Sequence, residues 1–582
     1  MQRFILNFRT FLSLFLPYFR SEDRWPGRAL LTGVIVLEFL LVYVAVLVNQ
    51  WNGRFFNALE ARDVPAIKDE LVFFGVIVLA AIATGGAQYW LGQHLLIRWR
   101  RWMTERFVGM WMADARHYRL RFVDQSVDNI HLRIGSDVYV FISKTYELGS
   151  GLIGHVIATT SFAVILWGIS ASTPLPLFGV DLAFPGYLIV VAFLYAMFGT
   201  LIAHLIGRPL IPLNFQQNRY EADFRFAMAR VTDNAEPVAL LHGEPVERAE
   251  LGKRFGALVR NWKALVVHQT RLTGFIYGYM NVSGVFPTLV VTPAYLIGAI
   301  PLGILMQATA AFQRVDAAFA FAIHAYARIA EWKAAMDRLA QFEAAMTTVD
   351  LPGLPGAAIE RSTAADPDLS INGLVLLQSA DERLATVPDL ELKPAERLLV
   401  SGPSGSGKST LMRALAGIWP LGCGRIGLPA GARVLALPQR PYFPLGTLRQ
   451  ALTYPTLATA VDDAEVRAAM AATGLAHLAD RLDQEADWAT ALSGGDQQRV
   501  GFARVLIHRP TIVLLDEAVS TLEDAEAREL YRTISEKLPA ATVISVGRSA
   551  ARVGAHHRNI ELAGAPVAGR IRGPLALAAV PA

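Results

Sequence analysis

The chain has 582 residues, of which 53% are hydrophobic and only 18% are charged, whereas about a quarter of the residues in soluble domains are charged. Its net charge of +4 is modest, and its Lys and Arg residues flank apolar runs, so the composition suggests no nucleic-acid partner. The single cysteine, Cys423, excludes an intramolecular disulfide framework and a cysteine-rich metal site, and we expect a buried, unreactive thiol.

The first half of the chain carries the pattern of a membrane protein. Its first twenty residues alternate Phe and Leu with arginines, which predicts an amphipathic elbow helix on the cytoplasmic surface rather than a cleaved signal peptide. Six apolar segments that follow are long enough to cross a bilayer as helices. These segments are residues 29–50, 71–91, 151–169, 186–206, 272–299 and 302–323.

Charges between the segments predict their orientation. Lys and Arg residues follow the second, fourth and sixth segments, whereas the connection from the third to the fourth carries only Asp181. Because cytoplasmic loops are enriched in Lys and Arg, both termini are expected in the cytoplasm. The two longest cytoplasmic connections, residues 98–150 and 208–271, hold few turn signals and predict helices that continue beyond the membrane. Short turns near residues 126–134 and 232–242 are then candidates for coupling to a cytoplasmic domain.

Ionisable residues inside the apolar segments need a partner or water. Glu38 lies midway along the first segment and either packs against a neighbouring helix or a water-filled cavity, or handles substrate or protons. Arg314 and Asp316 are two residues apart, so they face different sides of a helix and are expected to line a polar cavity. His155 and His204 belong to no metal-ligand pattern, and packing or interface positions are expected for both.

A phosphate-binding loop lies in the second half of the chain, in the pattern G-x-x-x-x-G-K-[ST]. Its glycines allow backbone N–H groups to turn onto phosphates, its lysine supplies positive charge, and its last serine offers a hydroxyl to Mg²⁺. The predicted nucleotide-binding residues are Gly402, Pro403, Ser404, Gly405, Ser406, Gly407, Lys408, Ser409 and Thr410.

A second phosphate-contacting motif, L-S-G-G-D-Q-Q-R, begins at Leu492 and contributes Ser493, Gly494 and Gly495. A helix that starts after this serine could hold a γ-phosphate at its N-terminus. The pair of motifs is typical of ABC-type ATPases and predicts an active site in which two chains close over one ATP.

An apolar run at residues 512–515 ends in two carboxylates, Asp516 and Glu517. We expect Asp516 to hold Mg²⁺ together with Ser409 and Gln439, and Glu517 to orient or deprotonate the attacking water. Gln439, which lies between the two phosphate motifs in the chain, is expected to sense the γ-phosphate and to contact the membrane helices.

Stretches in both halves resemble a known family. Residues 48–59 (V-N-Q-W-N-G-R-F-F-N-A-L), 97–104, 220–226, 327–332, 416–420 and 437–442 are similar to the SbmA/BacA-like transporters fused to an ATPase and to the peroxisomal ABCD-type half-transporters. The resemblance implies a multi-domain membrane protein, with a six-helix, all-α transmembrane domain of ABC exporter type followed by an α/β P-loop ABC ATPase domain. It also implies a homodimer, which some bacterial relatives use for uptake of hydrophilic peptides or corrinoids.

Two departures from the family stand out. Relatives read D-N-P-D-Q-R-I where residues 128–134 read D-N-I-H-L-R-I, which changes the first coupling turn although Asp128, Asn129 and Arg133 remain. Relatives have a switch histidine where this chain has Arg548, which cannot reproduce the geometry or the titration of imidazole. We therefore expect a catalytic set of Glu517, Gln439 and Arg548 with slow hydrolysis. Residues 376–378 also lack the expected adenine-stacking aromatic.

These observations divide the chain into an elbow helix (1–28), a transmembrane domain (29–346), a linker (347–368), an ATPase (369–562) and a tail (563–582). They predict an ATP- and Mg²⁺-dependent half-transporter that dimerises with a second copy in the lipid of a bacterial inner membrane and imports peptides or corrinoid-like solutes. Two alternatives stay open: an exporter of lipophilic or acyl compounds, and a hydrolysis-impaired ATP-sensing regulatory subunit.

Overall fold

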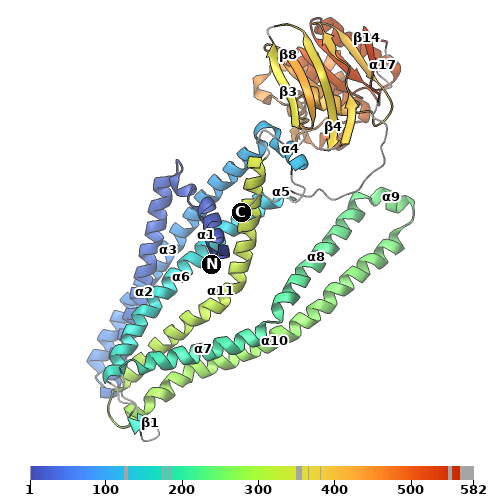
Figure 1. Cartoon of the computed structure of the whole chain (residues 1–582). Coiled ribbons are helices and arrows are strands. Elements are labelled where there is room, and N and C mark those ends of the chain that lie inside the picture. The colour runs from blue at the N-terminus through green and yellow to red at the C-terminus, as the bar shows by residue number, and fades with distance from the viewer. Residues whose placement is uncertain are drawn as a thin grey trace. The chain divides into compact units, whose positions relative to one another are not determined.

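The computed structural model of the chain describes residues 2–123, 129–172, 176–177, 180–181, 185–348, 357–364, 366–379, 382–547 and 554–563. The chain divides into two compact units (Figure 1). The first, a helical unit, contains Met1–Gly109 and Asn129–Glu343, and the second, an ATPase unit, contains Met110–Asp128 and Ala344–Ala582.

Long helices build the helical unit, as the apolar runs predict. They are α1 (Gln2–Phe15), α2 (Arg24–Ala61), α3 (Val64–Met112), α6 (Val138–Ser172), α7 (Tyr187–Gly207), α8 (Leu210–Asp233), α10 (Glu244–Leu296) and α11 (Leu302–Thr348). Shorter pieces connect them: 3₁₀ turns at Tyr18–Arg20 and Ala113–Ala115, α5 (Ile130–Leu132), a π-helical turn at Arg133–Asp137, β1 (Pro176–Leu177), β2 (Val180–Asp181) and α9 (Ala235–Leu240).

Helices α3, α10 and α11 are far longer than a bilayer requires. They contain 49, 53 and 47 residues, so at about 1.5 Å per residue each exceeds the hydrocarbon core of about 30 Å. The prediction that the connections at 98–150 and 208–271 continue as helices is therefore confirmed. The second predicted coupling turn, 232–242, contains the short helix α9.

Among the described helices, α2, α3, α6, α7 and α10 are long and apolar enough to cross a membrane. The sixth predicted segment, 302–323, forms the first part of α11. It is a helix of sufficient length, but it carries Gln307, Gln313, Arg314 and Asp316 and so falls short of the apolar character of the other five.

The N-terminal helix α1 ends at Phe15 and α2 begins at Arg24, so α1 is shorter than the predicted elbow. Asp23, just before α2, accepts a hydrogen bond from Arg98 Nε of α3 (3.0 Å) and another from the Tyr18 hydroxyl (3.1 Å). The Arg98 guanidinium holds the pKa of the Asp23 carboxyl below its usual range. Rings of α1 pack on α3 as well, with Phe15 and Trp99 edge to face at 5.4 Å.

The ATPase unit is built on two sheets. Its strands are β3 (Ala357–Ala364), β4 (Leu369–Ser379), β5 (Glu382–Thr386), β6 (Leu390–Leu392), β7 (Arg397–Ser401), β8 (Gly422–Pro429), β9 (Val434–Leu437), β10 (Gly446–Thr447), β11 (Glu485–Ala486), β12 (Ile512–Asp516), β13 (Thr542–Val546) and β14 (Arg558–Glu561). One sheet is parallel in the order β14-β7-β13-β12-β9, and the other, β3-β8-β4-β5 with β6 beside β4, is mostly antiparallel.

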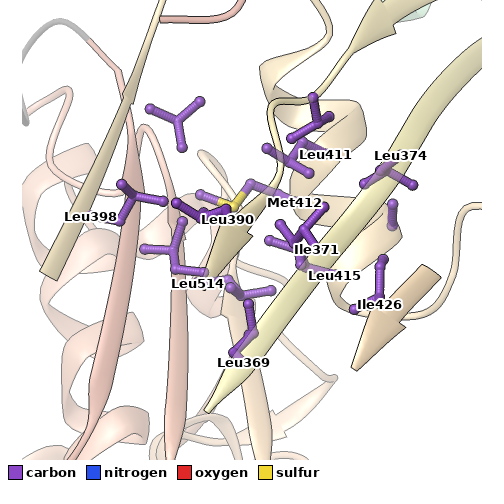
Figure 2. Packing of buried hydrophobic residues seen from close by; sticks show 14 of the residues in the cluster. Leu369, Ile371, Leu374, Leu390, Leu398, Leu411, Met412, Leu415, Ile426 and Leu514 are labelled. Atoms are coloured by element: carbon purple, nitrogen blue, oxygen red, sulfur yellow. The ribbon is translucent and has the colours of Figure 1, made fainter. Parts of the chain in front are cut away.

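The helices of this unit are α4 (Arg116–Val123), α12 (Lys408–Leu415), α13 (Leu448–Thr453), α14 (Asp463–Ala472), α15 (Trp488–Ala491), α16 (Gly494–His508) and α17 (Asp524–Lys537). A core of buried aliphatic side chains joins the two sheets through α12 (Figure 2). Leu411 and Leu415 of α12 belong to one buried cluster with Ile371 of the antiparallel sheet and Leu514 of the parallel one. The central strands β12 and β13 are buried on both faces, as strands of a covered parallel sheet are.

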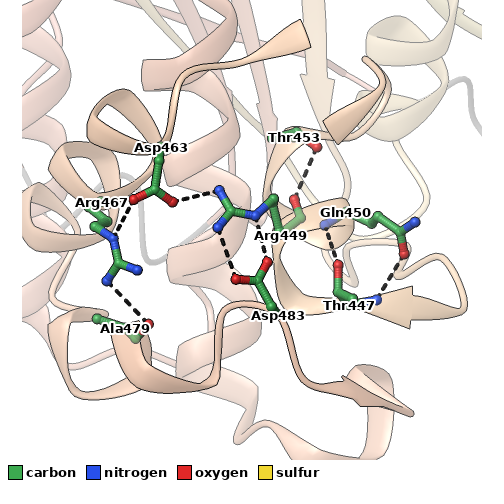
Figure 3. A network of polar contacts seen from close by, with 8 residues as sticks. All are labelled: Thr447, Arg449, Gln450, Thr453, Asp463, Arg467, Ala479 and Asp483. Carbon is green, nitrogen blue, oxygen red and sulfur yellow. Dashed lines mark hydrogen bonds and ion pairs between the residues drawn. The ribbon is translucent and has the colours of Figure 1, made fainter. Parts of the chain in front are cut away.

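Helices α13 to α16 form a small subdomain around a second buried cluster that includes Trp488. Its surface carries a network of charges (Figure 3). Arg449 of α13 pairs with Asp483 and with Asp463 of α14, each at 2.7 Å. Asp463 also pairs with Arg467 at 2.7 Å. The network ties two helices to the loop before β11.

Two expectations from the sequence need correction. The predicted linker, 347–368, contains β3, which pairs in parallel with β8 along its whole length, so the sheet begins before Leu369. Cys423 on β8 is exposed rather than buried. The pairing of β3 with β8 joins segments that are distant in the chain, so local sequence does not reveal it. Of the predicted tail, only Ala563 lies in the described part of the chain.

Candidate ATP-binding site

The predicted site residues follow four neighbouring strands of the parallel sheet. The loop after β7 begins at Gly402, β9 is followed by Gln439, β12 ends in Asp516, and Gly547 follows β13. Because the carboxyl ends of parallel strands meet at one edge of a sheet, segments distant in sequence come together there. Ligands of open α/β sheets bind at this edge.

The phosphate-binding loop runs from β7 into α12. Its glycines Gly402, Gly405 and Gly407 have φ of 142°, 82° and 88°, a region that residues with a side chain rarely adopt. At Gly402 a Cβ would also lie 2.5 Å from the Leu562 carbonyl oxygen. The loop wraps around Lys408, whose Nζ donates to the carbonyl oxygens of Gly402 (2.9 Å) and Pro403 (2.6 Å).

Two of the three predicted metal ligands, Ser409 and Asp516, meet at the start of α12, whereas Gln439 bonds to Glu517. Ser409 Oγ donates a hydrogen bond of 3.0 Å to Asp516 Oδ1. The two groups offer a hydroxyl and a carboxylate, the hard oxygen ligands that suit Mg²⁺. Mg²⁺ coordinates few protein groups and keeps its other positions for water and phosphate oxygens. The donor set of this chain therefore fits a Mg²⁺ bound with ATP.

The predicted catalytic carboxylate is held in an unusual backbone conformation. Glu517 has φ of 51°, the left-handed region, and its N–H donates to the Val546 carbonyl (3.0 Å) at the end of β13. Its side chain accepts a hydrogen bond of 2.9 Å from Gln439 Nε2. The strained turn directs the half-buried carboxylate toward the edge where the phosphate-binding loop lies.

The second phosphate motif begins helix α16. Ser493 is its N-cap, since Ser493 Oγ accepts a hydrogen bond from the Asp496 N–H (3.1 Å). Ser493 and Gly494 are exposed, so the helix start is accessible in a single chain. An exposed helix N-terminus attracts anions.

Sequence reasoning missed the role of Gln498 within this same motif. Gln498 is only 3% exposed, donates to Ser520 Oγ (3.1 Å) and accepts from the Thr521 N–H (3.2 Å). It thereby fixes the loop after Glu517 to α16. The position of Gln498 in the motif could have indicated a functional residue. Its partner Ser520, however, lies 22 residues further along the chain.

Arg548, predicted in place of a switch histidine, lies outside the described residues. Its neighbour Gly547 has φ of 127°, and a Cβ there would lie 3.1 Å from Glu517 Cγ. The glycine therefore allows the chain to leave β13 close to the catalytic carboxylate.

The loop that follows α12 contacts helix α4 of the same unit. Phe122 and Trp419 meet edge to face at 4.9 Å, and Arg119 reaches the Gly417 carbonyl at 3.5 Å. The predicted first coupling turn, 126–134, lies partly outside the described residues, and Ile130 to Ile134 belong to α5 and the π-helical turn. The contact with the Trp419 loop is made by α4, just before that turn.

Two ionisable residues of the membrane helices, Asp316 and Glu38, have protein partners. Asp316 does not line a cavity: it is 7% exposed and accepts hydrogen bonds from Tyr279 (2.6 Å) and Ser283 (2.8 Å) of α10. Arg314 is exposed. Glu38 accepts a hydrogen bond from the Gln88 amide of α3. Among the described residues, no group of three or more His, Cys, Asp or Glu side chains could hold a metal ion.

Comparison with known proteins matches each half of the chain to a family model. The model of the ABC transporter transmembrane region 2 matches residues 14–296, and the ABC transporter ATPase model matches residues 386–520. An ABC transporter ATP-binding protein of Synechocystis is 33% identical over 93% of this chain and 81% of its own length. The inner membrane ABC transporter ATP-binding protein YddA of Escherichia coli is 30% identical over 92% and 94% of the two chains.

More distant relatives carry names of the ABCD group. The lysosomal cobalamin transporter ABCD4 of Homo sapiens is 26% identical over 94% of this chain and 92% of its own. A solved structure of a bacterial Atm1-family ABC exporter with ATP bound superposes with a TM-score of 0.70 at 18% identity, covering 92% of this chain and 93% of that one. That likeness concerns the fold alone.

Proposed function

Because this chain belongs to the ABC transporter family, as a half-transporter of the ABCD type with one transmembrane region and one fused ATPase, we propose that it works as a homodimer in a bacterial inner membrane and uses ATP to import hydrophilic solutes such as peptides or corrinoids. Both termini then face the cytoplasm. We propose the domain boundaries expected from the sequence, except that the ATPase begins with β3.

One observation carries the ATPase part of the proposal. The phosphate-binding loop, the carboxylates Asp516 and Glu517, and Gln439 lie at one edge of the parallel sheet, linked by the contacts Ser409 to Asp516 and Gln439 to Glu517. These are the groups that phosphoryl transfer to water requires: a phosphate cradle, a metal ligand and a water-orienting carboxylate. The exposed start of α16 is free to cover the ATP held by the second chain.

Each residue has a role in this scheme. Lys408 turns its ammonium group from the loop carbonyls to the β- and γ-phosphates, and the N–H groups of the loop and of Thr410 surround them. Ser409 and Asp516, assisted by Gln439, would hold Mg²⁺, which would supply positive charge to neutralise the phosphates. Glu517 orients the attacking water, and Arg548 supplies positive charge near the γ-phosphate in place of a histidine.

A named relative supports the proposed solute class. ABCD4, which aligns over nearly the whole chain, is named a lysosomal cobalamin transporter, and cobalamin is a corrinoid. Contacts that could transmit ATP-driven motion are those of Phe122 and Arg119 of α4 with the Trp419 loop. We propose the same role for α9 (Ala235–Leu240), which lies in the second predicted coupling turn.

Proteoliposomes in which the ATPases face outward test this function. They are preloaded with radiolabelled cobalamin or a hydrophilic peptide, and Mg-ATP is added outside. An importer moves the solute from the lumen toward the ATPase side, so ATP should deplete the lumen, and Lys408→Ala should abolish the depletion. In vesicles that receive the solute outside rather than inside, ATP-dependent accumulation in the lumen would instead identify an exporter. ATP binding without turnover or solute movement would identify the regulatory subunit.

A further inference from the structure

The stretch at residues 48–59, which marks the family resemblance but plays no part in the ATP site, forms the last three turns of α2. Its polar and small residues Asn49, Gly53, Asn57 and the following Glu60 recur at intervals of four, four and three residues, which places them on one face of the helix. Trp51 belongs to the other side. The end of α2 therefore presents two different faces.

The face that carries Trp51 is bound to α3. Trp51 stacks on Phe74 at 4.3 Å, and its indole N–H donates to the Glu70 carbonyl (2.8 Å). Arg54 pairs with the Glu70 carboxylate at 2.6 Å. Ring stacking and an ion pair together tie α2 to α3.

The other face meets α11 at close range. The Asn49 amide donates to the Gln307 carbonyl (2.9 Å). One turn nearer the end of α2, the two backbones touch: a Cβ on Gly303 would lie 1.9 Å from the Gly53 carbonyl oxygen. Only glycine at position 303 permits this approach.

The last part of this face supplies the N-terminal cap of α11. Asn57 Oδ1 accepts a hydrogen bond from the Gly303 N–H (2.8 Å), and Glu60 Oε2 accepts one from the Leu302 N–H (2.9 Å). The first N–H groups of a helix have no acceptor within it, and a carboxylate there is favoured by the helix dipole. Glu60 also accepts from the Tyr295 hydroxyl of α10 (3.1 Å). Thus α11 is capped by side chains of another helix.

The contact between α2 and α11 has a buried end at Asn49 and an exposed end at Glu60, and the two helices can separate more easily at the exposed end. Asn49 is 2% exposed, so its hydrogen bond could not be replaced by water without opening the bundle. Glu60 is exposed, and water can take over its carboxylate and the N–H groups it caps. The cap lies at the start of α11, and the last residues of this 47-residue helix already belong to the ATPase unit.

We propose that Asn57 and Glu60, on the N–H groups of Leu302 and Gly303, form a releasable latch at the membrane face that lies away from the cytoplasm in the proposed orientation. The latch opens when ATP binds, while α2 stays attached to α3 and turns about its buried contact at Asn49. The inference rests on the proposed ATP-driven transport, because alternating access needs a contact at each membrane face that can part.

Cysteine cross-linking of the full-length dimer in lipid vesicles tests the latch. Cys423→Ser removes the one native cysteine. Glu60→Cys with Leu302→Cys reports the separation of the two helix ends while Asn57 keeps its bond to the Gly303 N–H. Arg54→Cys with Glu70→Cys is the matched control on the α2–α3 face. With Glu517→Gln present, Mg-ATP should reduce the oxidative cross-link of the latch pair about tenfold and leave the control pair unchanged.

Two results would overturn the latch. One is an equal yield of the latch pair with and without Mg-ATP in vesicles that bind a fluorescent ATP analogue, and the other is an equal loss in both pairs. Vesicles that fail to bind the analogue would overturn the proposed function as well, so the two failures are distinguishable.

Labelling supplies a measurement that needs no ATP. With Leu302→Cys as the reporter, Glu60→Ala should raise the rate of modification by a membrane-impermeant maleimide about three- to tenfold, since the cap is lost. Glu60→Gln keeps an acceptor oxygen and should stay near the parent, and so should Arg54→Ala. Equal rates in Glu60→Ala and the parent would contradict a latch at this position.

Discussion

The side-chain amide of Gln439 donates a hydrogen bond of 2.9 Å to the carboxylate of Glu517, and so joins the loop after β9 to the end of β12. Gln439 is exposed, whereas Glu517 is half-buried and held in the left-handed region at φ of 51°. The contact therefore lets a surface loop orient the carboxylate that we assign to the attacking water.

Gln439→Glu should test this contact with almost no change in volume. It replaces a donor by a second carboxylate, which would repel Glu517 and disturb its orientation. We expect ATP turnover to fall about tenfold or more with little change in the affinity for ATP, measured as steady-state hydrolysis and as binding of a fluorescent analogue. Gln484→Glu, the same change on an exposed loop, is the control and should behave as the parent. If Gln439→Glu hydrolyses ATP at the parental rate, Gln439 takes no part in catalysis.

Arg548, which stands where the family resemblance implies a switch histidine, is expected to limit the chemical step. Arg548→His restores the residue that the family resemblance implies and should raise ATP turnover while the affinity for ATP changes little, because only the transition-state contact is improved. Steady-state hydrolysis by purified full-length protein is the measurement, and Arg528→His, a surface change on α17, is its control. Equal or lower turnover in Arg548→His would count against a limiting arginine.

The ATP site was predictable because most of its residues lie in short, contiguous sequence motifs. The loop 402–409 and the pair Asp516–Glu517 each follow a strand, and a parallel sheet brings such ends together whatever the intervening sequence. The pairing of β3 with β8, the exposure of Cys423 and the hydroxyl donors to Asp316 depend on partners from distant segments. Spacing along one helix does not contain that information, so the predicted cavity for Asp316 was wrong.

The stability of the ATPase unit should fall on mild acidification, through His556. Burial, followed by the positive charges of Arg397 and His557, lowers the pKa of His556 from 6.5 to about 4. Its ring packs 5.4 Å from that of Tyr531, and its Nε2 has no hydrogen-bond partner in the described part of the chain. Between pH 6.5 and 4 the unfolded chain binds a proton that the folded chain excludes, so stability is complete above pH 6.5 and declines below it.

His556→Gln should flatten this decline. In the parent we expect a loss of about 1 kcal/mol between pH 7 and pH 5, after allowance for the partial exposure of the ring, and in the variant a smaller loss. Urea unfolding of the full chain at the two pH values measures it. His557→Gln, at the exposed neighbour, should keep most of the parental dependence. A pH dependence that is identical in His556→Gln and the parent would assign the effect to other groups.

Close packing around Glu38 gives a prediction for the helical unit. Gly154 of α6 leaves room for this carboxylate, because a Cβ there would lie 2.0 Å from Glu38 Oε1. Gly154→Ala should therefore unfold at a lower temperature in detergent than the same change at an open position of α6, because the Glu38 carboxylate must shift. Gly149→Ala is the matched control on the same helix, since a Cβ there meets no atom within 4 Å. Equal unfolding temperatures for the two variants would show that Glu38 does not pack against α6.

Retention of ATP by the Glu517→Gln variant tests the central claim most directly. The substitution removes the carboxylate that directs water but keeps the phosphate-binding loop, so ATP should bind without being hydrolysed. After Mg-ATP is added and free nucleotide removed, we expect one unhydrolysed ATP per chain in a closed dimer, and none when Lys408→Ala is added. Hydrolysis by Glu517→Gln at the parental rate would contradict the account of this site.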